Sequence, residues 1–255
     1  MGQQLRRTEA RSGGVGPVRR ALLAAAAIAA AAAAAAPAGA QLRVTKGADL
    51  ALPVALGPNQ GAILVAFRRP DSMSLGKSGI FAFARYDLEN RDLLYQPKGA
   101  KKAGDMTTYW VEVASSAKKS EVEYHLMVVS AGDYVLYGAT PGVKQVMSTF
   151  CFGSPTFSVR PGEVVYFGDI TPYTNARLAD GRKVPAMADS ANPEAARAAL
   201  AKQAALLAAF RPAELRNQAT YSCAGQAMMR YVVPGVAELE PLPPVAEGEA
   251  EPATP

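Results

Sequence analysis

Short apolar runs separated by turn residues fill the middle of this chain, and they constrain its fold more than any other feature. The runs are AILVAF (62–67), IFAFARY (80–86), TTYWVEVA (107–114), VEYHLMVV (122–129), DYVLYGA (133–139), VMSTFCF (146–152) and FSVRPGEVVYFGDI (157–170). Segments of this length that are rich in Val, Tyr and Phe are typical of β-strands. Closely spaced strands of this kind build a sandwich or a barrel. We therefore predict a mainly β protein, an antiparallel β-sandwich, over residues 41–172.

Two connections between these runs carry specific turn chemistry. Ser-Ala-Gly-Asp at 130–133 is short and contains a glycine that accepts a positive φ. Arg-Pro-Gly-Glu at 160–163 has proline at the first corner and glycine at the second, as a type II turn requires. Each connection is predicted to close a β-hairpin. In the second hairpin, apolar and polar residues alternate over 157–160, so this strand should bury one face. Residues 164–167 are apolar throughout, so the return strand should be central in its sheet.

The pattern changes after residue 170. Residues 171–191 contain proline and Asp-Gly signals and are expected to form a loop. Asn192-Pro193-Glu194 then supplies an N-cap, a proline at the first helical position and an acid in the first turn. This predicts one helix over 193–211, within a segment 173–237 of loop and helix packed on the strands. The helix is expected to bury Leu200, Leu207 and Phe210.

The C-terminal residues 238–255 have the composition of a disordered tail. They hold five Glu, five Pro and no basic residue. A segment with so few apolar groups and such a charge has little to bury. We expect it to be dispensable for folding.

The first forty residues follow the pattern of a bacterial secretory signal peptide. Arginines precede an uncharged run at 21–36, and Ala38-Gly39-Ala40 then places cleavage between Ala40 and Gln41. A membrane-spanning helix needs about 20 apolar residues, and this alanine-rich run is shorter. The pair Arg19-Arg20 also resembles a twin-arginine signal, so general and twin-arginine export both remain open. We predict a periplasmic or otherwise exported bacterial protein whose mature chain has no transmembrane span.

Removal of the signal peptide changes the charge of the chain. The full sequence holds 27 basic and 22 acidic residues, of which residues 1–40 contribute five arginines and one glutamate. The mature chain therefore has 22 basic and 21 acidic groups and is close to neutral. Nucleic-acid binding rests on clustered Lys and Arg, so we expect no nucleic-acid partner.

The stretch from YHLMVVSAGDYVLYGA to FSVRPGEVVYFGDI, residues 124–170, resembles a broad class of uncharacterised bacterial envelope proteins, periplasmic or lipoprotein-like. In that class an aGdY hairpin is followed by an F.V.pGEvvYfGdi hairpin in a small β-sandwich. The resemblance implies the sandwich fold and an envelope location. It supplies no catalytic residues.

Few residue patterns in the sequence indicate chemistry. His125 is the only histidine, so neither a histidine-rich metal site nor an HExxH helix is present. The GKS at 76–78 lacks the first glycine of a phosphate-binding loop, and no GxSxG occurs. Glu163 and Asp169 are separated by a strand and do not form the close pair of a glycosidase. We predict no catalytic, cofactor or metal site.

Aromatic residues offer one candidate binding surface. Tyr109, Trp110 and Tyr173 could stack against a ligand, as in sugar-binding modules. Core packing is the favoured interpretation for Trp110, because a tryptophan on a strand is usually interior.

The two cysteines, Cys151 and Cys223, leave three alternatives. In an oxidising compartment they form a disulfide, which is the favoured interpretation. They could instead be two buried thiols, or Cys151 could be a nucleophile activated by His125. Two functions follow: a non-catalytic envelope protein that binds a partner protein, glycan or envelope component, or a Cys-dependent periplasmic hydrolase or transferase.

Overall fold

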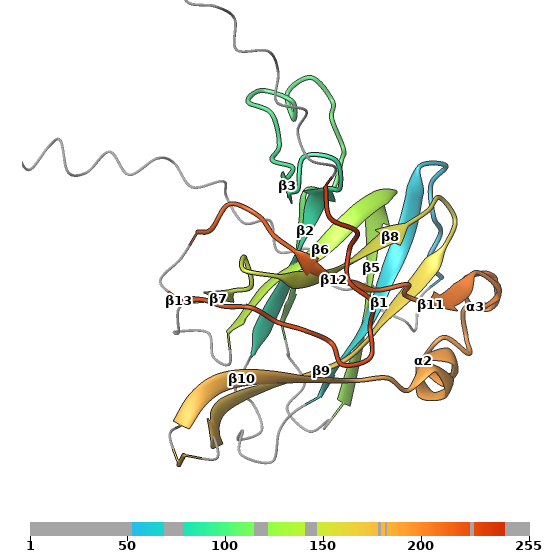
Figure 1. Cartoon of the computed structure of the whole chain (residues 1–255). Coiled ribbons are helices and arrows are strands. Elements are labelled where there is room, and N and C mark those ends of the chain that lie inside the picture. The colour runs from blue at the N-terminus through green and yellow to red at the C-terminus, as the bar shows by residue number, and fades with distance from the viewer. Residues whose placement is uncertain are drawn as a thin grey trace, which may run out of the picture. The chain divides into compact units, whose positions relative to one another are not determined.

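Two β-sheets make up most of the described structure (Figure 1). The computed structural model describes residues 53–68, 79–114, 122–140, 147–177, 180–181, 183–224 and 227–242, with the backbone alone at 172–177 and 183–186. All of these residues belong to the unit Arg43–Pro255. The expected signal peptide, its cleavage site at Ala40 and Gln41, and the GKS at 76–78 lie outside the described residues. The prediction of a mainly β protein is confirmed.

Sheet A is mixed, so the prediction of purely antiparallel strands is wrong. It contains β1 (Gln60–Arg68), β5 (Val122–Ser130), β9 (Val164–Arg177), β10 (Lys183–Ser190) and β11 (Phe210–Pro212). The order is β10-β9-β1-β5, with β11 beside the start of β9. Strands β1 and β9 run parallel, as do β11 and β9, whereas the β1–β5 and β9–β10 pairs are antiparallel. The central position predicted for the strand after 163 is confirmed.

Sheet B follows the order β12-β8-β6-β2-β3, with β4 beside β2, β7 beside β6 and β13 beside β7. Its strands are β2 (Ile80–Asp87), β3 (Asp92–Leu93), β4 (Trp110–Ala114), β6 (Gly132–Thr140), β7 (Ser148–Thr149), β8 (Ser154–Val159), β12 (Arg216–Ala219) and β13 (Ala227–Met228). These pairs are antiparallel except β13 with β7. The run predicted over 146–152 contributes only the two residues of β7.

Side chains from both sheets meet in one cluster, the inner core. Phe83 of β2 contacts Phe157 of β8 and Phe167 of β9, with ring centroids 5.5 and 4.9 Å apart. Other members include Ile63, Val65, Phe67, Phe81, Val111, Val113, Met127, Val129, Tyr134, Leu136, Val159, Val165 and Ile170. Alternation along each strand sends these residues to one face of its sheet. Each sheet therefore also has an outer face.

The two predicted hairpins are wrong, although their turn glycines behave as expected. Strand β5 pairs with β1 in sheet A, while β6 pairs with β2 and β8 in sheet B. Likewise β8 belongs to sheet B and β9 to sheet A. Gly132 and Gly162 do take positive φ values of 151° and 77°. Both short connections therefore reverse the chain between sheets rather than within one.

The backbone groups of these connections bind the start of β1, which explains the difference. The Ala131 N–H donates to the Asn59 carbonyl at 2.9 Å, and the Gly162 N–H donates to the Gln60 carbonyl at 2.8 Å. A Cβ on Gly61 would lie 2.5 Å from Val159 Cγ1 and 2.7 Å from the Arg160 carbonyl oxygen. Turn chemistry specifies a reversal of the chain but not which strand becomes the hydrogen-bonded partner.

The loop expected over 171–191 is wrong for the residues described there. Strand β9 continues to Arg177 and β10 returns along it, so the two form a long antiparallel pair (Figure 1). The loop was predicted from turn-forming residues: proline at 172 and 185, and Asp-Gly at 180–181. Long-range pairing with β9 overrides these local signals.

The single helix predicted over 193–211 is two short helices, α2 (Pro193–Ala199) and α3 (Ala204–Ala208). The N-cap is confirmed, because the Asn192 side chain accepts a hydrogen bond from the Ala195 N–H at 3.1 Å. The break falls before Gln203, which is buried and accepts a hydrogen bond from the Val54 N–H at 3.1 Å. Within the described ranges, no helix has the length and hydropathy to cross a membrane.

The helices cover the outer face of sheet A. Leu200, Leu206 and Phe210 are buried against this face, and Leu207 is partly buried. The sheet contributes Ala62, Leu64, Leu126, Val164 and Tyr166. The predicted burial of Leu200 and Phe210 is confirmed, and Leu206 carries more of the contact than Leu207.

The C-terminal segment, residues 216–242, buries Tyr231 and Val233 in the inner core, and other parts of it cover part of the outer face of sheet B. Ala219 and Tyr221 are buried there with Ala84, Tyr86, Val135 and Cys151, and Leu239 packs against them. The Leu239 N–H also donates to the Asn217 carbonyl at 2.9 Å. The boundary predicted at Glu238 is therefore too early, because residues 238–239 are still docked on the sheet. Residues 243–255 lie outside the described part of the chain.

Candidate functional site

Cys151 and Cys223 form a disulfide, as the favoured interpretation predicted. Their Cα atoms are 5.3 Å apart and their sequence separation is 72. Cys151 lies buried in the turn before β8, and Cys223 follows β12 in the C-terminal segment. The bond ties this segment to sheet B. Because these are the two cysteines of the sequence, neither is a thiol in this structure.

The structure does not bring Cys151 and His125 together. Cys151 belongs to the outer-face cluster of sheet B. His125 lies on β5 of sheet A, directly opposite Val65. A cysteine nucleophile needs both a thiolate and a nearby base. The Cys151–His125 enzyme therefore gains no support from the geometry.

His125 instead neighbours Glu123, two residues earlier on the same strand. Its Nε2 atom is 3.7 Å from Glu123 Oε2, and both side chains are largely buried. Burial lowers the pKa of His125, and the Glu123 carboxylate partly opposes this. A largely buried histidine kept neutral in this way suits a structural position on a strand.

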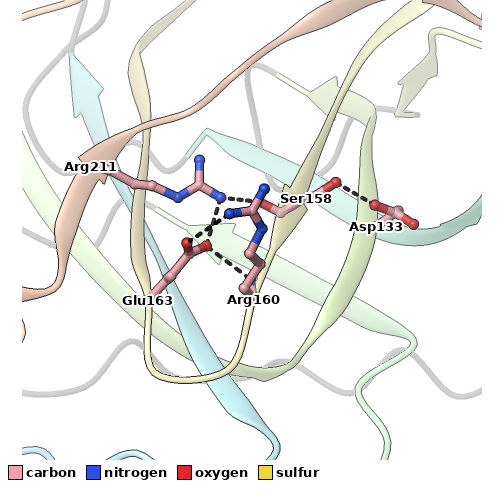
Figure 2. A network of polar contacts seen from close by, with 5 residues as sticks. All are labelled: Asp133, Ser158, Arg160, Glu163 and Arg211. Atoms are coloured by element: carbon pink, nitrogen blue, oxygen red, sulfur yellow. Dashed lines mark hydrogen bonds and ion pairs between the residues drawn. The ribbon is translucent and has the colours of Figure 1, made fainter.

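Glu163 belongs to a network that joins the two sheets (Figure 2). Arg211 of β11 donates to Glu163 Oε2 at 2.6 Å and to the Ser158 carbonyl of β8 at 3.1 Å. The Arg160 N–H donates to the same carboxylate at 3.1 Å. Burial raises the pKa of Glu163, but these hydrogen bonds outweigh it and hold the pKa below its usual value. The carboxylate thus anchors the β8–β9 connection.

Asp169 is fully buried on the outer face of sheet A and is held by two partners. Arg68 Nε donates to its Oδ2 at 2.7 Å, and the Tyr166 hydroxyl donates to its Oδ1. The Tyr166 oxygen in turn accepts from the Asn192 N–H at 2.9 Å. Asp169 and Glu163 therefore serve separate contacts, as their spacing suggested. In the described part of the chain, no three His, Cys, Asp or Glu side chains gather where they could hold a metal ion.

The predicted aromatic trio does not form a described surface. Tyr109 turns to Asp105, whose Oδ2 accepts its hydroxyl at 3.1 Å, and the side chain of Tyr173 lies outside the described residues. The core packing predicted for Trp110 is found in part: its side chain is partly buried and packs against the buried cluster on the outer face of sheet B, not in the inner core. Its ring meets Tyr137 edge to face, with centroids 4.4 Å apart.

Further aromatic side chains extend this group. Tyr221 stacks on Tyr137 at 5.5 Å between centroids. Its hydroxyl accepts from the Phe150 N–H at 2.9 Å and donates to the Tyr137 carbonyl. Burial, and then the nearby Tyr95, raise the pKa of Tyr137. Tyr95 itself is 60% exposed. We call Tyr95, Trp110, Tyr137 and Tyr221 the aromatic face.

A buried carboxyl group lies beside the aromatic face. Glu112 follows Trp110 by two residues on β4 and is 9% exposed. Burial raises the pKa of Glu112, and the Trp110 indole N–H opposes the rise. Within the described ranges, that indole nitrogen makes no hydrogen bond of regular geometry. Glu112 is therefore a buried acid without a strong partner.

Sequence reasoning missed Glu112, Tyr137 and Tyr95 as site residues, although a signal for the first existed. In WVEVA, Val111 and Val113 are the apolar pair of an alternating strand and enter the inner core. Alternation then sends Trp110 and Glu112 to the opposite face. Tyr137 lies on β6 and Tyr95 follows β3, and the sequence holds no signal that joins them to Trp110.

Comparisons with protein-family models, with curated proteins and with solved structures find no significant match to this chain.

Proposed function

We propose that this chain is an exported, non-catalytic protein of the bacterial cell envelope that binds a partner protein, a glycan or another envelope component. Its two sheets would form a β-sandwich, and residues 1–40 would be removed as a signal peptide. The Cys151–Cys223 disulfide carries this proposal. Such bonds persist in oxidising compartments, and this one leaves Cys151 without the free thiol that a cysteine nucleophile needs.

The environments of the other reactive side chains support the same view. Glu163 binds Arg211, Asp169 binds Arg68 and Tyr166, and His125 lies beside Glu123. General acid–base chemistry needs groups within hydrogen-bond reach of one another and of a substrate. These three groups lie in separate contacts of the described structure.

The test is to express the full chain in a Gram-negative bacterium and isolate the processed protein from the periplasm. Its N-terminus should be Gln41, and unreduced, denatured protein should have no titratable thiol. An intact Met1 in the membrane fraction, or two titratable thiols, would contradict the proposal. In a strain that depends on the chain, His125→Ala should restore the wild-type phenotype. Loss of the phenotype with a folded variant would favour the enzyme.

A further inference from the structure

The chain between β3 and β4 is a long loop whose two ends meet on Arg85 of β2. The Leu94 N–H donates to the Arg85 carbonyl at 3.0 Å, and the Arg85 N–H donates to the Tyr109 carbonyl at 2.9 Å. We call residues 95–108 the basic loop. In Figure 1 this part of the chain extends beyond the strands next to the β3 label. Long surface loops with adjacent ends and no helix or strand of their own are frequently functional.

Hydrogen bonds within the basic loop give it a defined shape. Gly104 has a positive φ of 85°. Its N–H donates to the Lys101 carbonyl at 3.2 Å, and the Asp105 N–H donates to the Ala100 carbonyl at 3.0 Å. Two such bonds around a residue of positive φ close a helical turn as a Schellman motif. The side chains of the basic loop are therefore carried on a specific backbone conformation.

The basic loop concentrates positive charge. Lys98, Lys101 and Lys102 are exposed, and within the described residues none of them forms an ion pair. The one acid of the loop, Asp105, accepts a hydrogen bond from the Thr107 N–H at 2.9 Å. Three lysines and one aspartate give the loop a net charge of +2, in a mature chain whose charges nearly cancel.

Most acids that precede the basic loop are also engaged within the protein. Asp87 accepts from the Glu89 and Asn90 N–H groups at 2.9 Å, and Asp92 accepts from the Ser222 N–H at 2.8 Å. Glu89 is left as the exposed acid of the turn between β2 and β3. The three lysines outnumber it, so this end of the molecule attracts anions.

Large apolar side chains are exposed in the same segment as the lysines. Met106 is 78% exposed, Tyr95 is 60% exposed, and Leu94, just before the loop, is 38% exposed. Lysine extends its ammonium group on an apolar stem, so it can remain solvated beside such groups. The basic loop therefore offers both positive charge and apolar area to a partner.

We propose that the basic loop docks the protein on an anionic phospholipid membrane. This inference rests on the proposed function, because it names the envelope component that the chain binds. Each lysine near an anionic lipid surface strengthens binding roughly fivefold. Tyr95 and Met106 would enter the boundary between headgroups and acyl chains, where tyrosine is enriched and apolar side chains are buried.

Other classes of partner fit the basic loop less well. Protein interfaces are enriched in arginine and depleted in lysine, whereas the cations of this loop are all lysines. A small anion is held by donors that converge on it from a concave site. The three lysines of the loop are instead exposed to solvent.

Co-sedimentation with vesicles tests the inference on the processed, oxidised protein. It should bind vesicles of phosphatidylcholine and phosphatidylglycerol in equal amounts, and should bind pure phosphatidylcholine at least about tenfold more weakly. Raising the salt from about 0.01 to about 1 M should release the protein, because the Debye length falls from about 30 to about 3 Å.

Variants of the basic loop separate its two contributions. Lys98→Gln, Lys101→Gln and Lys102→Gln combined should weaken binding by about 100-fold, as expected for three lysines at an anionic surface. Met106→Ser removes apolar area without a change of charge and should weaken binding by about fivefold or more. All four side chains are exposed, so these variants should keep the fold.

A second triple variant is the charge-matched control. Lys202→Gln, Arg216→Gln and Arg230→Gln remove the same charge from exposed positions outside the loop. Binding should stay within about threefold of wild type, because attraction to the surface falls off within a Debye length.

Four results would overturn the inference. The first is equal binding to neutral and anionic vesicles, or binding to neither. The second is an equal loss in the two triple variants, which would mean that net charge alone acts. The third is unchanged binding of Met106→Ser. The fourth is retention on dextran sulfate, an anionic polymer without acyl chains, with no binding to vesicles. None of these affects the N-terminus or the thiol count, so the proposed function fails or stands separately.

Discussion

The outer faces of the two sheets are covered in different ways. The difference shows how apolar packing and specific bonds each hold a covering segment in place. Helices α2 and α3, with the start of β11 that follows them, bring large apolar groups to the outer face of sheet A, among them Leu200, Leu206 and Phe210. The C-terminal segment brings Ala219 and Tyr221 to the outer face of sheet B, with Leu239 partly buried, and its Tyr231 and Val233 enter the inner core. Burial of a large side chain stabilises by about 1.5–3 kcal/mol, so the helices can be held by packing alone.

On the outer face of sheet B, the C-terminal segment adds specific bonds to a smaller apolar contact. Its disulfide joins Cys223 to Cys151. The buried Asn217 side chain donates to the Val233 and Val236 carbonyls at 2.9 and 3.0 Å and accepts from the Val233 N–H at 3.1 Å. Covalent and hydrogen-bonded closure of this kind adds to the apolar burial that holds the segment in place. Four experiments test this contrast.

The largest effect is expected from Cys151→Ala combined with Cys223→Ala. Loss of a bond with a sequence separation of 72 should lower the free energy of unfolding by about 4 kcal/mol in the chain-entropy model. Urea unfolding of the processed protein measures this, and reduction of the wild type should reproduce it. A loss below about 1 kcal/mol would mean that packing alone holds the C-terminal segment.

Leu200→Ala tests the packed side of the comparison. Leu200 is fully buried, so the cavity should cost about 3 kcal/mol of unfolding free energy. Leu207→Ala is the matched control, and because that side chain is only partly buried its cost should be clearly smaller. Equal costs in urea unfolding would contradict the view that the buried side chains of α2 and α3 hold them on sheet A.

Asn217→Ala tests the hydrogen-bonded closure of the C-terminal segment. It leaves the Val233 N–H without its partner and removes both donors to the carbonyls of 233 and 236, which should cost about 2 kcal/mol. Hydrogen exchange should rise at 231–239 and stay unchanged in α2. Thr220→Ala, an exposed change nearby, should remain within about 0.5 kcal/mol. Faster hydrogen exchange both at 231–239 and in α2 would show that the C-terminal segment and the helices do not open independently.

Truncation gives the smallest effect. Ending the chain after Ala237 removes the Leu239 contacts and its hydrogen bond to Asn217, and should cost about 1 kcal/mol. Ending it after Leu242 should leave the melting temperature unchanged, because the residues removed, 243–255, are mainly Glu, Pro and Ala. Equal melting temperatures for the two truncations would restore the boundary at Glu238.

Several features could be predicted because they depend on neighbours in the chain. The strands β1, β2, β4, β5, β6 and β9 follow from local runs of β-branched and aromatic residues. The helix N-cap at Asn192 and the positive φ of Gly162 follow from residue types at fixed offsets. The disulfide followed from cysteine count and compartment, not from geometry.

The candidate site was less accessible to sequence reasoning. Strand alternation could have placed Trp110 and Glu112 on one face, because that information is local. The meeting of Trp110 with Tyr137 depends on which strands become neighbours. No local pattern contains that choice.

The sequence by itself determined the β character of the chain, the positions of its reversals and the first turn of α2. The tertiary structure alone decided that both predicted hairpins cross between sheets, that β9 and β10 replace a loop, and that the predicted helix is broken before Gln203. The physical reason is the same in each case. Backbone conformation responds to adjacent residues, whereas pairing and burial are settled by surfaces that meet only when distant segments have folded together.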